Sequence, residues 1–272
     1  SVLGFTFMGI AIKYLPRIPT YEKVFFRNSV SLMLSAFILF KQKESIKVEK
    51  ENIPFVFGRS FFGFVGMVAN FYALEYLTMA EANMLNKLSP VFVTICACIF
   101  LKERVDKKQV IGIILMLLAV VFVIKPSFSP EIIPSLAGLF SAVLAGFSYT
   151  IIRYLNGKVK SEINVLYFSL LSVVCTFPLM MMNFVKPTLS EFFILLGGIG
   201  ISAAIGQFGL TYAYTFAPAS EVSIYNYVII ITSMLMDYIL FSTIPDLFSF
   251  IGGFIIISTA IYLYIHNKKK DN

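Results

Sequence analysis

The residues of this sequence that could do chemistry are polar and ionisable side chains inside long apolar runs. Within 81–101, Asn83, Asn86, Lys87 and Pro90 fall at i, i+3, i+4 and i+7, which is one face of a helix. A charge at the centre of a bilayer costs roughly 2.5–3.5 kcal/mol on insertion scales, so it is kept only beside a partner or water. We therefore predict that this face lines a central cavity, with polar packing between helices as the alternative.

Polar residues in neighbouring apolar runs are candidates for the same cavity. The run at 220–241 carries Asn226 on a face that continues to Asp237. Arg27 and Arg59 lie inside runs of their own, although either side chain could instead extend to the membrane surface. For the tyrosines, placement in the core or at the membrane interface is the alternative. The predicted substrate-binding residues are Arg27, Arg59, Asn70, Tyr72, Asn83, Asn86, Lys87, Gln207, Tyr212 and Asn226.

Two acidic residues and one proline have other predicted roles. Glu81 opens its run, where it could complement the helix dipole, pair with Lys87 or an arginine, or carry a coupling proton. Asp237 is the second candidate for coupling or ion pairing. Pro90 removes one backbone hydrogen bond, and the resulting kink could act as a gate or be purely structural.

The composition argues against several classes of protein. His266 is the only histidine, which excludes a histidine-based metal cluster and argues against a Ser-His-Asp device. The cysteines Cys96, Cys98 and Cys175 lie in apolar stretches and form no C-x-x-C pair. No nucleotide-binding motif is present. We therefore predict neither a cofactor nor a metal site.

The elements that must position these residues are membrane spans. The chain of 272 residues is 58% hydrophobic and only 14% charged, which is too few charges to cover a globular surface of that size. We predict an all-α integral membrane protein with ten transmembrane helices. The predicted spans are approximately 1–15, 20–40, 53–77, 81–101, 109–125, 134–156, 162–184, 189–216, 220–241 and 245–266.

The basic residues indicate the orientation of these spans. They concentrate after even-numbered spans, near 41–50, 102–108 and 153–160, and in a basic tail at 267–272. The positive-inside rule then places both termini in the cytoplasm of a protein of the cell membrane. The net charge of +7 is explained in this way, so no nucleic-acid partner is expected. Because the first span is short and the chain starts at Ser1, we expect the N-terminus to be trimmed.

The two halves of the chain align without a gap at an offset of 140 positions. The matches include Glu22 with Glu162, Tyr72 with Tyr212, Glu81 with Glu221, Asn86 with Asn226, and Asp106 with Asp246. Because each copy holds five spans, the second must enter from the opposite side of the membrane. The sequence thus predicts two inverted five-helix repeats, 1–125 and 134–266, an architecture typical of secondary transporters with a substrate site near the midplane.

Several short motifs carry a resemblance to a known family. They are F-Y-A-L-E-Y-L at 71–77, Glu81, Pro90, L-K-E-R at 101–104 and Q-V-I-G at 109–112. With them, the chain resembles the drug/metabolite transporter superfamily, in particular its EamA-type branch with ten spans.

The resemblance implies export or exchange of amino acids, nucleotide sugars, drugs, quaternary amines or other metabolites. Arg27 and Arg59 also look like family features. The second half departs from the pattern. At the position equivalent to Pro90 it has Ile230, and at the position equivalent to Glu103 it has Thr243 in place of an acidic residue. We therefore do not expect the two halves to be functionally equivalent.

These observations favour a secondary active transporter that works by alternating access on a small polar metabolite. A proton gradient or a counter-substrate would supply the energy. The basic residues Arg27, Arg59 and Lys87 inside the membrane favour cargo with a carboxylate, such as amino acids or organic acids.

Glu75, Glu81 and Asp237 act as a counterweight, so other cargoes stay open. The first alternative is an exporter of cationic or aromatic compounds that uses tyrosine and phenylalanine walls for cation–π contacts. An integral-membrane enzyme acting on lipid is less favoured, because it needs clustered histidine, aspartate or a nucleophile. A channel is also less favoured, because of the inverted repeat.

Overall fold

The computed structural model describes residues 1–100, 102, 105–125, 132–216 and 225–271, and in these parts the chain is helical with no strand. Eight helical segments are long and apolar enough to cross a membrane, and α1 and α12 are shorter apolar helices. The helices are α1 (Val2–Lys13), α2 (Thr20–Lys41), α3 (Ile53–Tyr76), α4 (Met79–Asn86), α5 (Ser89–Phe100), α6 (Lys107–Ile124), α7 (Ile132–Leu155), α8 (Ser161–Met182), α9 (Leu189–Phe193), η1 (Ile194–Ile201), α10 (Ser202–Phe216), α12 (Val228–Phe241) and α13 (Leu247–Asp271).

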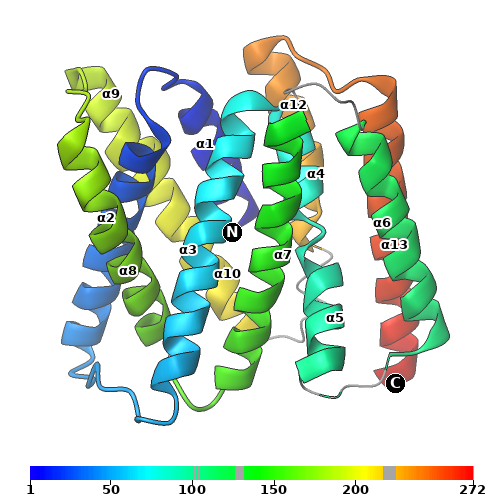
Figure 1. Ribbon diagram of the computed structural model, residues 1–272, viewed down its shortest axis with the longest axis horizontal. Coiled ribbons are helices and arrows are strands. Elements are labelled where there is room, and N and C mark those ends of the chain that lie inside the picture. Colours follow the sequence, from blue (N-terminus) through cyan, green and yellow to red (C-terminus); the bar gives the residue numbers. More distant parts are fainter. Residues whose placement is uncertain (101, 103–104, 126–131, 217–224, 272) are drawn as a thin grey trace.

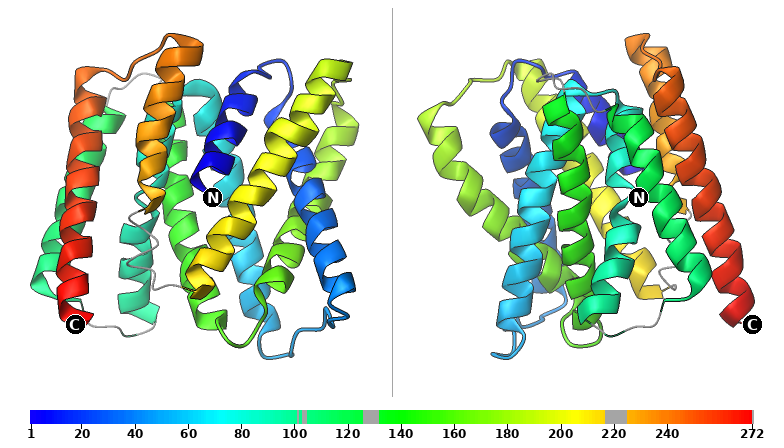
Figure 2. Two further views of the ribbon diagram at one scale, coloured as in Figure 1. Left: turned by 180° about the vertical axis from the view of Figure 1, so that it is seen from behind. Right: turned by 45° about the vertical axis from the view of Figure 1, so that its right-hand side comes forward.

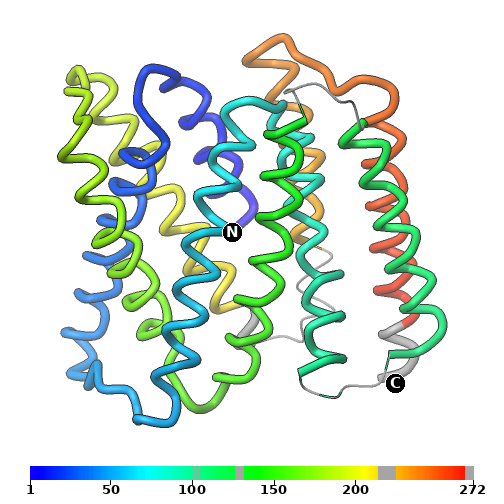
Figure 3. The backbone as a smooth tube through the Cα atoms, in the orientation of Figure 1, coloured from blue at the N-terminus to red at the C-terminus, as the bar shows by residue number. Residues whose placement is uncertain are grey.

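The helices form one bundle with two lateral pairs (Figure 1). Helices α2 and α8 pack together at one side, and α6 and α13 pack together at the other. Between them α3 packs on α7, and α5 packs on α7 near the end of the bundle that holds the C-terminus. Seen from behind, α1 crosses α10 beside α12 (Figure 2). The backbone trace shows that Ser1 lies midway along the bundle, so α1 spans only its upper half (Figure 3).

The fourth predicted span is broken into α4 and α5. The helix stops at Asn86, and α5 starts at Ser89, so Pro90 is the second residue of α5. Proline has no N–H to donate to the carbonyl of Asn86. The N–H of Val91 bonds to the carbonyl of Leu88 at 2.9 Å, three residues back rather than the four of an α-helix. The kink predicted at Pro90 therefore falls at a complete break in the helix.

The eighth predicted span also changes its winding. It begins as α9, continues as the π-helix η1 and ends as α10. Small residues allow the close packing that this segment makes. A Cβ on Gly200 would lie 2.5 Å from Val30 Cγ2, and one on Gly4 would lie 2.6 Å from Ser202 O, so neither position accommodates a side chain without movement.

Helices α6 and α13 begin with the same kind of cap. Asp106 accepts a hydrogen bond from the N–H of Gln109 at 2.8 Å, and Asp246 accepts one from the N–H of Ser249 at 2.9 Å. His266, near the end of α13, lies 2.8 Å from Asp106 at the start of α6. The one histidine of the chain thus joins two helix ends.

The connections after α2 and α7, the end of α5 and the C-terminal end of α13 lie at one end of the bundle, the lower end in Figure 1. We call this the basic end, because most of the lysines outside the helices are found there, including Lys43, Lys47, Lys50 and Lys158. Part of the predicted span at 220–241, with Glu221, lies outside the described residues, as does Asn272 of the predicted tail.

Candidate functional site

A cavity of about 110 Å³, lined by both polar and apolar side chains, lies between the helices of the bundle. One buried water needs only about 10–15 Å³ by this measure, so the cavity has room for several waters or a small solute. It is bordered by α1, α2, α3, α4, α7, α8, α10 and α12. Seven of the ten predicted substrate-binding residues line it, namely Arg27, Arg59, Asn70, Asn83, Asn86, Lys87 and Gln207.

Three predicted residues lie outside this cavity. Tyr72 packs its ring on Tyr76, with centroids 4.7 Å apart. The hydroxyl of Tyr212 donates to Glu162 at 3.0 Å, and Asn226 is half-buried. Two positions along a helix turn the side chain by about 200°, so Tyr72 faces away from a cavity that Asn70 lines.

The two arginines share one aromatic neighbour. The guanidinium carbons of Arg59 and Arg27 lie 4.4 and 5.3 Å from the centre of the Phe168 ring. Arg27 also donates to Asn28 Oδ1 at 2.7 Å and to Gln207 Oε1 at 3.2 Å. Exposed fractions of 4% for Arg27 and 3% for Arg59 show that neither side chain reaches the surface. Their cationic heads are therefore held inside the bundle.

Several polar atoms of the site have no hydrogen-bond partner among the described residues. These are Nε of Arg27, Nε of Arg59 and Oδ1 of Asn70. Most buried polar groups in proteins are hydrogen-bonded, so such a cluster needs an explanation. Unused donors and an unused acceptor beside one cavity are what a polar ligand requires.

Lys87 lies at the break between α4 and α5, in the cavity lining. Its neighbour Asn86 donates to Ser141 Oγ on α7 at 3.2 Å. One turn earlier, Asn83 donates to Ser233 Oγ on α12 at 2.9 Å. The predicted polar face of this helix is thus tied to two neighbouring helices, and Lys87 lies at the point where the helix is interrupted.

Sequence reasoning missed four cavity residues with polar or aromatic side chains on α7 and α8. Ser141, Ser148 and Tyr149 come from α7, and Phe168 comes from α8. Ser141 and Ser148 are seven positions apart, on one helix face, and this spacing was the available signal. Phe168 carried none, because one phenylalanine among 29 has nothing to distinguish it.

The acidic residues expected to balance the basic ones lie elsewhere. No Asp or Glu is among the described residues that line the cavity. Glu75 accepts from Lys23 Nζ at 2.6 Å, and Asp237 Oδ2 accepts from the N–H of Ala80 at 2.8 Å. Glu81 is bound to Lys125 at 3.2 Å and to the hydroxyl of Ser249, rather than to Lys87 or an arginine.

Ion pairs join the helices at the end opposite the basic end. Lys125 bridges Glu81 and Asp246, the latter at 2.8 Å. Partial burial opposes the charge of Lys125, but its bond to Asp246 and the nearby Glu81 raise its pKa above the usual value.

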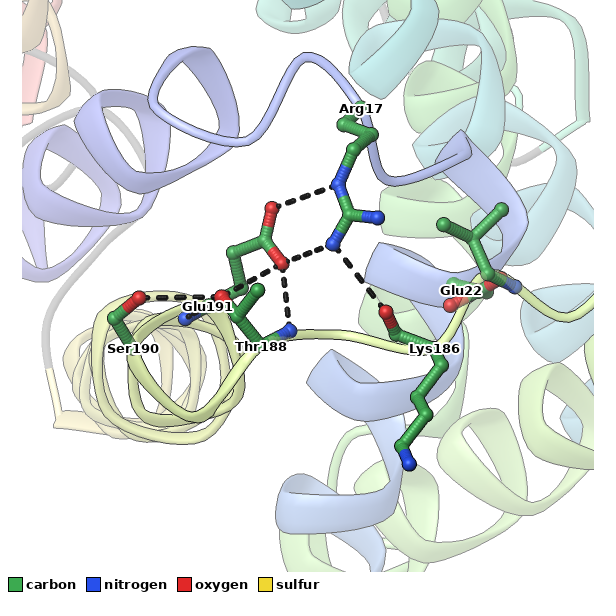
Figure 4. Close-up of polar contacts among 7 residues, drawn as sticks. Arg17, Glu22, Lys186, Thr188, Ser190 and Glu191 are labelled. Carbon is green, nitrogen blue, oxygen red and sulfur yellow. Dashed lines mark hydrogen bonds and ion pairs between the residues drawn. The ribbon is translucent and has the colours of Figure 1, made fainter.

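A second ion pair at this end links the α1–α2 connection to α9. Figure 4 shows Arg17 directed at Glu191, whose carboxylate also accepts from Thr188. Arg17 donates to the carbonyl of Lys186 as well, at 3.3 Å. This end of the bundle is therefore fastened by charged contacts between segments far apart in the sequence.

An apolar helical bundle with three basic residues lining a cavity fits a membrane transport protein. The model of the EamA-like transporter family matches residues 1–125. A pseudopaline exporter from Pseudomonas aeruginosa is 30% identical over 90% of this chain and 86% of its own length. An S-adenosylmethionine uptake transporter from Rickettsia conorii is 27% identical over 100% of this chain and 92% of its own.

The chain belongs to the EamA-like transporter family of the drug/metabolite transporter type. It is a multi-pass membrane transporter and not an enzyme. A crystal structure superposes on it with a TM-score of 0.67 over 99% of this chain and 98% of that one, at 19% identity, which shows a shared fold.

Proposed function

We propose that this protein is a secondary active transporter, an exporter or exchanger, that moves a small carboxylate-bearing metabolite by alternating access. One observation carries the proposal: Arg27, Arg59 and Lys87 line a cavity whose described lining residues include no acidic side chain. Buried charges are normally paired, and an anionic cargo would supply the missing partner. Amino acids and organic acids have the required group.

Helix boundaries support ten spans in two inverted repeats, 1–125 and 134–266, with α1 and α12 as the two shorter spans. Helices α6 and α13 begin 140 positions apart. The break before α5 and the turn before α12 fall at Lys87 and Tyr227, again 140 positions apart. Paired discontinuous helices at corresponding positions are typical of transporters that bind substrate between their repeats.

The helix contacts support the same pseudo-twofold relation. If α1 is exchanged with α7, α3 with α10 and α5 with α12, the α3–α7 contact becomes α10–α1 and the α5–α7 contact becomes α12–α1. The lateral pairs α2–α8 and α6–α13 map onto themselves. Both members of each exchanged contact are present.

We propose that the basic end, with the tail at 267–272, faces the cytoplasm of a cell membrane, and that the N-terminus is cytoplasmic as well. The positive-inside rule supports this orientation, because the basic residues of the connections gather at that end.

For energy coupling we propose a proton or a counter-substrate, with Asp237 and Glu81 as the candidate groups. Asp237 is fully buried and holds the first turn of α4, the half-helix that leads to Lys87. Protonation of its carboxylate would weaken that hold, since a neutral acid is a poorer acceptor.

The named relatives support a metabolite as cargo. S-adenosylmethionine is an amino-acid derivative and carries a carboxylate, but it also carries a sulfonium cation and an aromatic base. Export of cationic or aromatic compounds is therefore the second candidate. It is less favoured here, because two guanidinium groups already lie against Phe168 and would repel a cation.

The test is thermal stabilisation of the purified protein by a panel of metabolites. A ligand that binds the folded state raises the melting temperature by mass action. We expect stabilisation by amino acids or organic acids, and we expect Lys87→Ala to weaken it by roughly tenfold in Kd, because a charged hydrogen bond is lost.

Lys41→Ala, at the exposed end of α2, is the matched control and should leave the response unchanged. A response limited to cationic aromatic compounds, or full stabilisation of the Lys87→Ala variant by a carboxylate, would contradict the proposal.

A further inference from the structure

The three cations of the cavity fall into two groups, which we call the arginine pair (Arg27 and Arg59) and Lys87. The arginine pair lies on α2 and α3 against Phe168, so its guanidinium carbons are separated by no more than the sum of their two distances to that ring, 5.3 and 4.4 Å. Lys87 lies at the broken helix, between α4 and α5. The two groups therefore reach the cavity from different walls.

Helix α3 shows how the two groups are placed along the cavity. The guanidinium of Arg59 lies beside Gly63, where a Cβ would be 2.5 Å from Nη1. The break at Lys87 lies nearer Gly66. Asn86, beside the break, donates to the hydroxyl of Ser141. The backbone carbonyl of Ser141 would be 3.3 Å from a Cβ on Gly66. Gly63 and Gly66 are three residues apart, which is a rise of about 4.5 Å. The broken helix thus borders the cavity about one helical turn along α3 from the Arg59 guanidinium.

The chemistry of each group suits an anion. The arginine pair has an unused Nε on each guanidinium, and planar guanidinium groups bind carboxylates through paired hydrogen bonds. Lys87 offers a compact ammonium charge with three donors. Neither group has an acidic partner among the described lining residues, so a ligand with one negative charge would leave the other group unbalanced.

We propose that the cargo carries two carboxylates, one bound by the arginine pair and the other by Lys87. Asn70 lines the same cavity, and its carbonyl oxygen accepts no hydrogen bond from the described residues. A hydroxyl or amino group on the cargo would satisfy it, so amino- or hydroxy-dicarboxylic acids fit best. This inference rests on the proposed function, which requires only one carboxylate.

The test compares matched ligands on the full-length protein in lipid nanodiscs. Each pair shares a carbon skeleton and differs by one negative charge: glutamate and glutamine, and succinate and butyrate. We expect the dicarboxylate to bind at least about tenfold more tightly, since one charged hydrogen bond contributes roughly that factor. In Lys87→Met the advantage should disappear, because the second carboxylate loses its partner and the dicarboxylate is weakened more than the monocarboxylate.

Lys87→Arg keeps the positive charge and should retain the preference, and Lys41→Met at the exposed basic end controls for the loss of a lysine. Elution as a single species and an unchanged helical spectrum establish that each variant is folded. Equal affinities for the two members of each pair, or a Lys87→Met variant that weakens both equally, would overturn the two-group arrangement and leave the proposed function standing. Failure of every carboxylate to bind would overturn both.

Discussion

Replacement of Arg59 by methionine should lower transport by about a hundredfold without preventing folding. Arg59 contributes an unused donor to the cavity, and loss of one charged partner of a buried anion costs about 2–5 kcal/mol. Methionine retains much of the stem that packs near Phe168. Removal of one charge also relieves the repulsion between Arg59 and Arg27, so the melting temperature should stay the same or rise.

Exchange of labelled cargo in proteoliposomes measures the loss, and the melting temperature of the same preparation shows that the variant is folded. Arg153→Met, at the exposed end of α7, is the matched control and should transport normally. An Arg59→Met protein that keeps more than half of the wild-type rate would show that Arg59 does not contact the cargo.

Replacement of Glu75 by leucine should lower the free energy of unfolding strongly. The side chain of Lys23 is fully buried, and its ammonium lies 2.6 Å from Oε1 of Glu75, whose side chain is 18% exposed. Removal of one member of a buried pair leaves the other charge without compensation and costs about 3–5 kcal/mol. In a chain of this size the melting temperature should fall by roughly 10 °C.

A double variant separates the lost pair from lost packing. Lys23→Met together with Glu75→Leu removes both charges and should recover most of the melting temperature. Glu44→Leu breaks the pair with Lys160, whose side chains are 38% and 53% exposed, and should have almost no effect. A Glu75→Leu protein as stable as the Glu44→Leu protein would show that the Lys23–Glu75 pair is not a structural constraint.

The helices could be predicted from the sequence, because run length and composition are local properties. The break before α5 has a local cause as well, since Pro90 cannot donate a backbone hydrogen bond. The π-helix η1 could not be predicted, because its winding is associated with packing against α1 and α2, far away in the sequence.

The candidate site was predictable on single helices and not between them. The helical period brought Asn83, Asn86 and Lys87 to one face, and all three line the cavity. The partners of the acidic residues depend on contacts across the bundle. Glu81 binds Lys125, 44 positions away, and not the nearer Lys87. The sequence therefore left the net charge of the cavity lining open, whereas the structure supports a positive net charge.

A cavity lined by three cations has a consequence for the response to voltage. Moving one elementary charge through a membrane potential of 100 mV involves about 2.3 kcal/mol of electrical work. With two carboxylates bound, most of the charge of Arg27, Arg59 and Lys87 is neutralised, whereas the empty cavity retains all of it. We expect the empty carrier to reorient at a higher electrical cost than the loaded one. A carrier of this kind returns most readily with a second molecule bound, which favours one-for-one exchange over net flux.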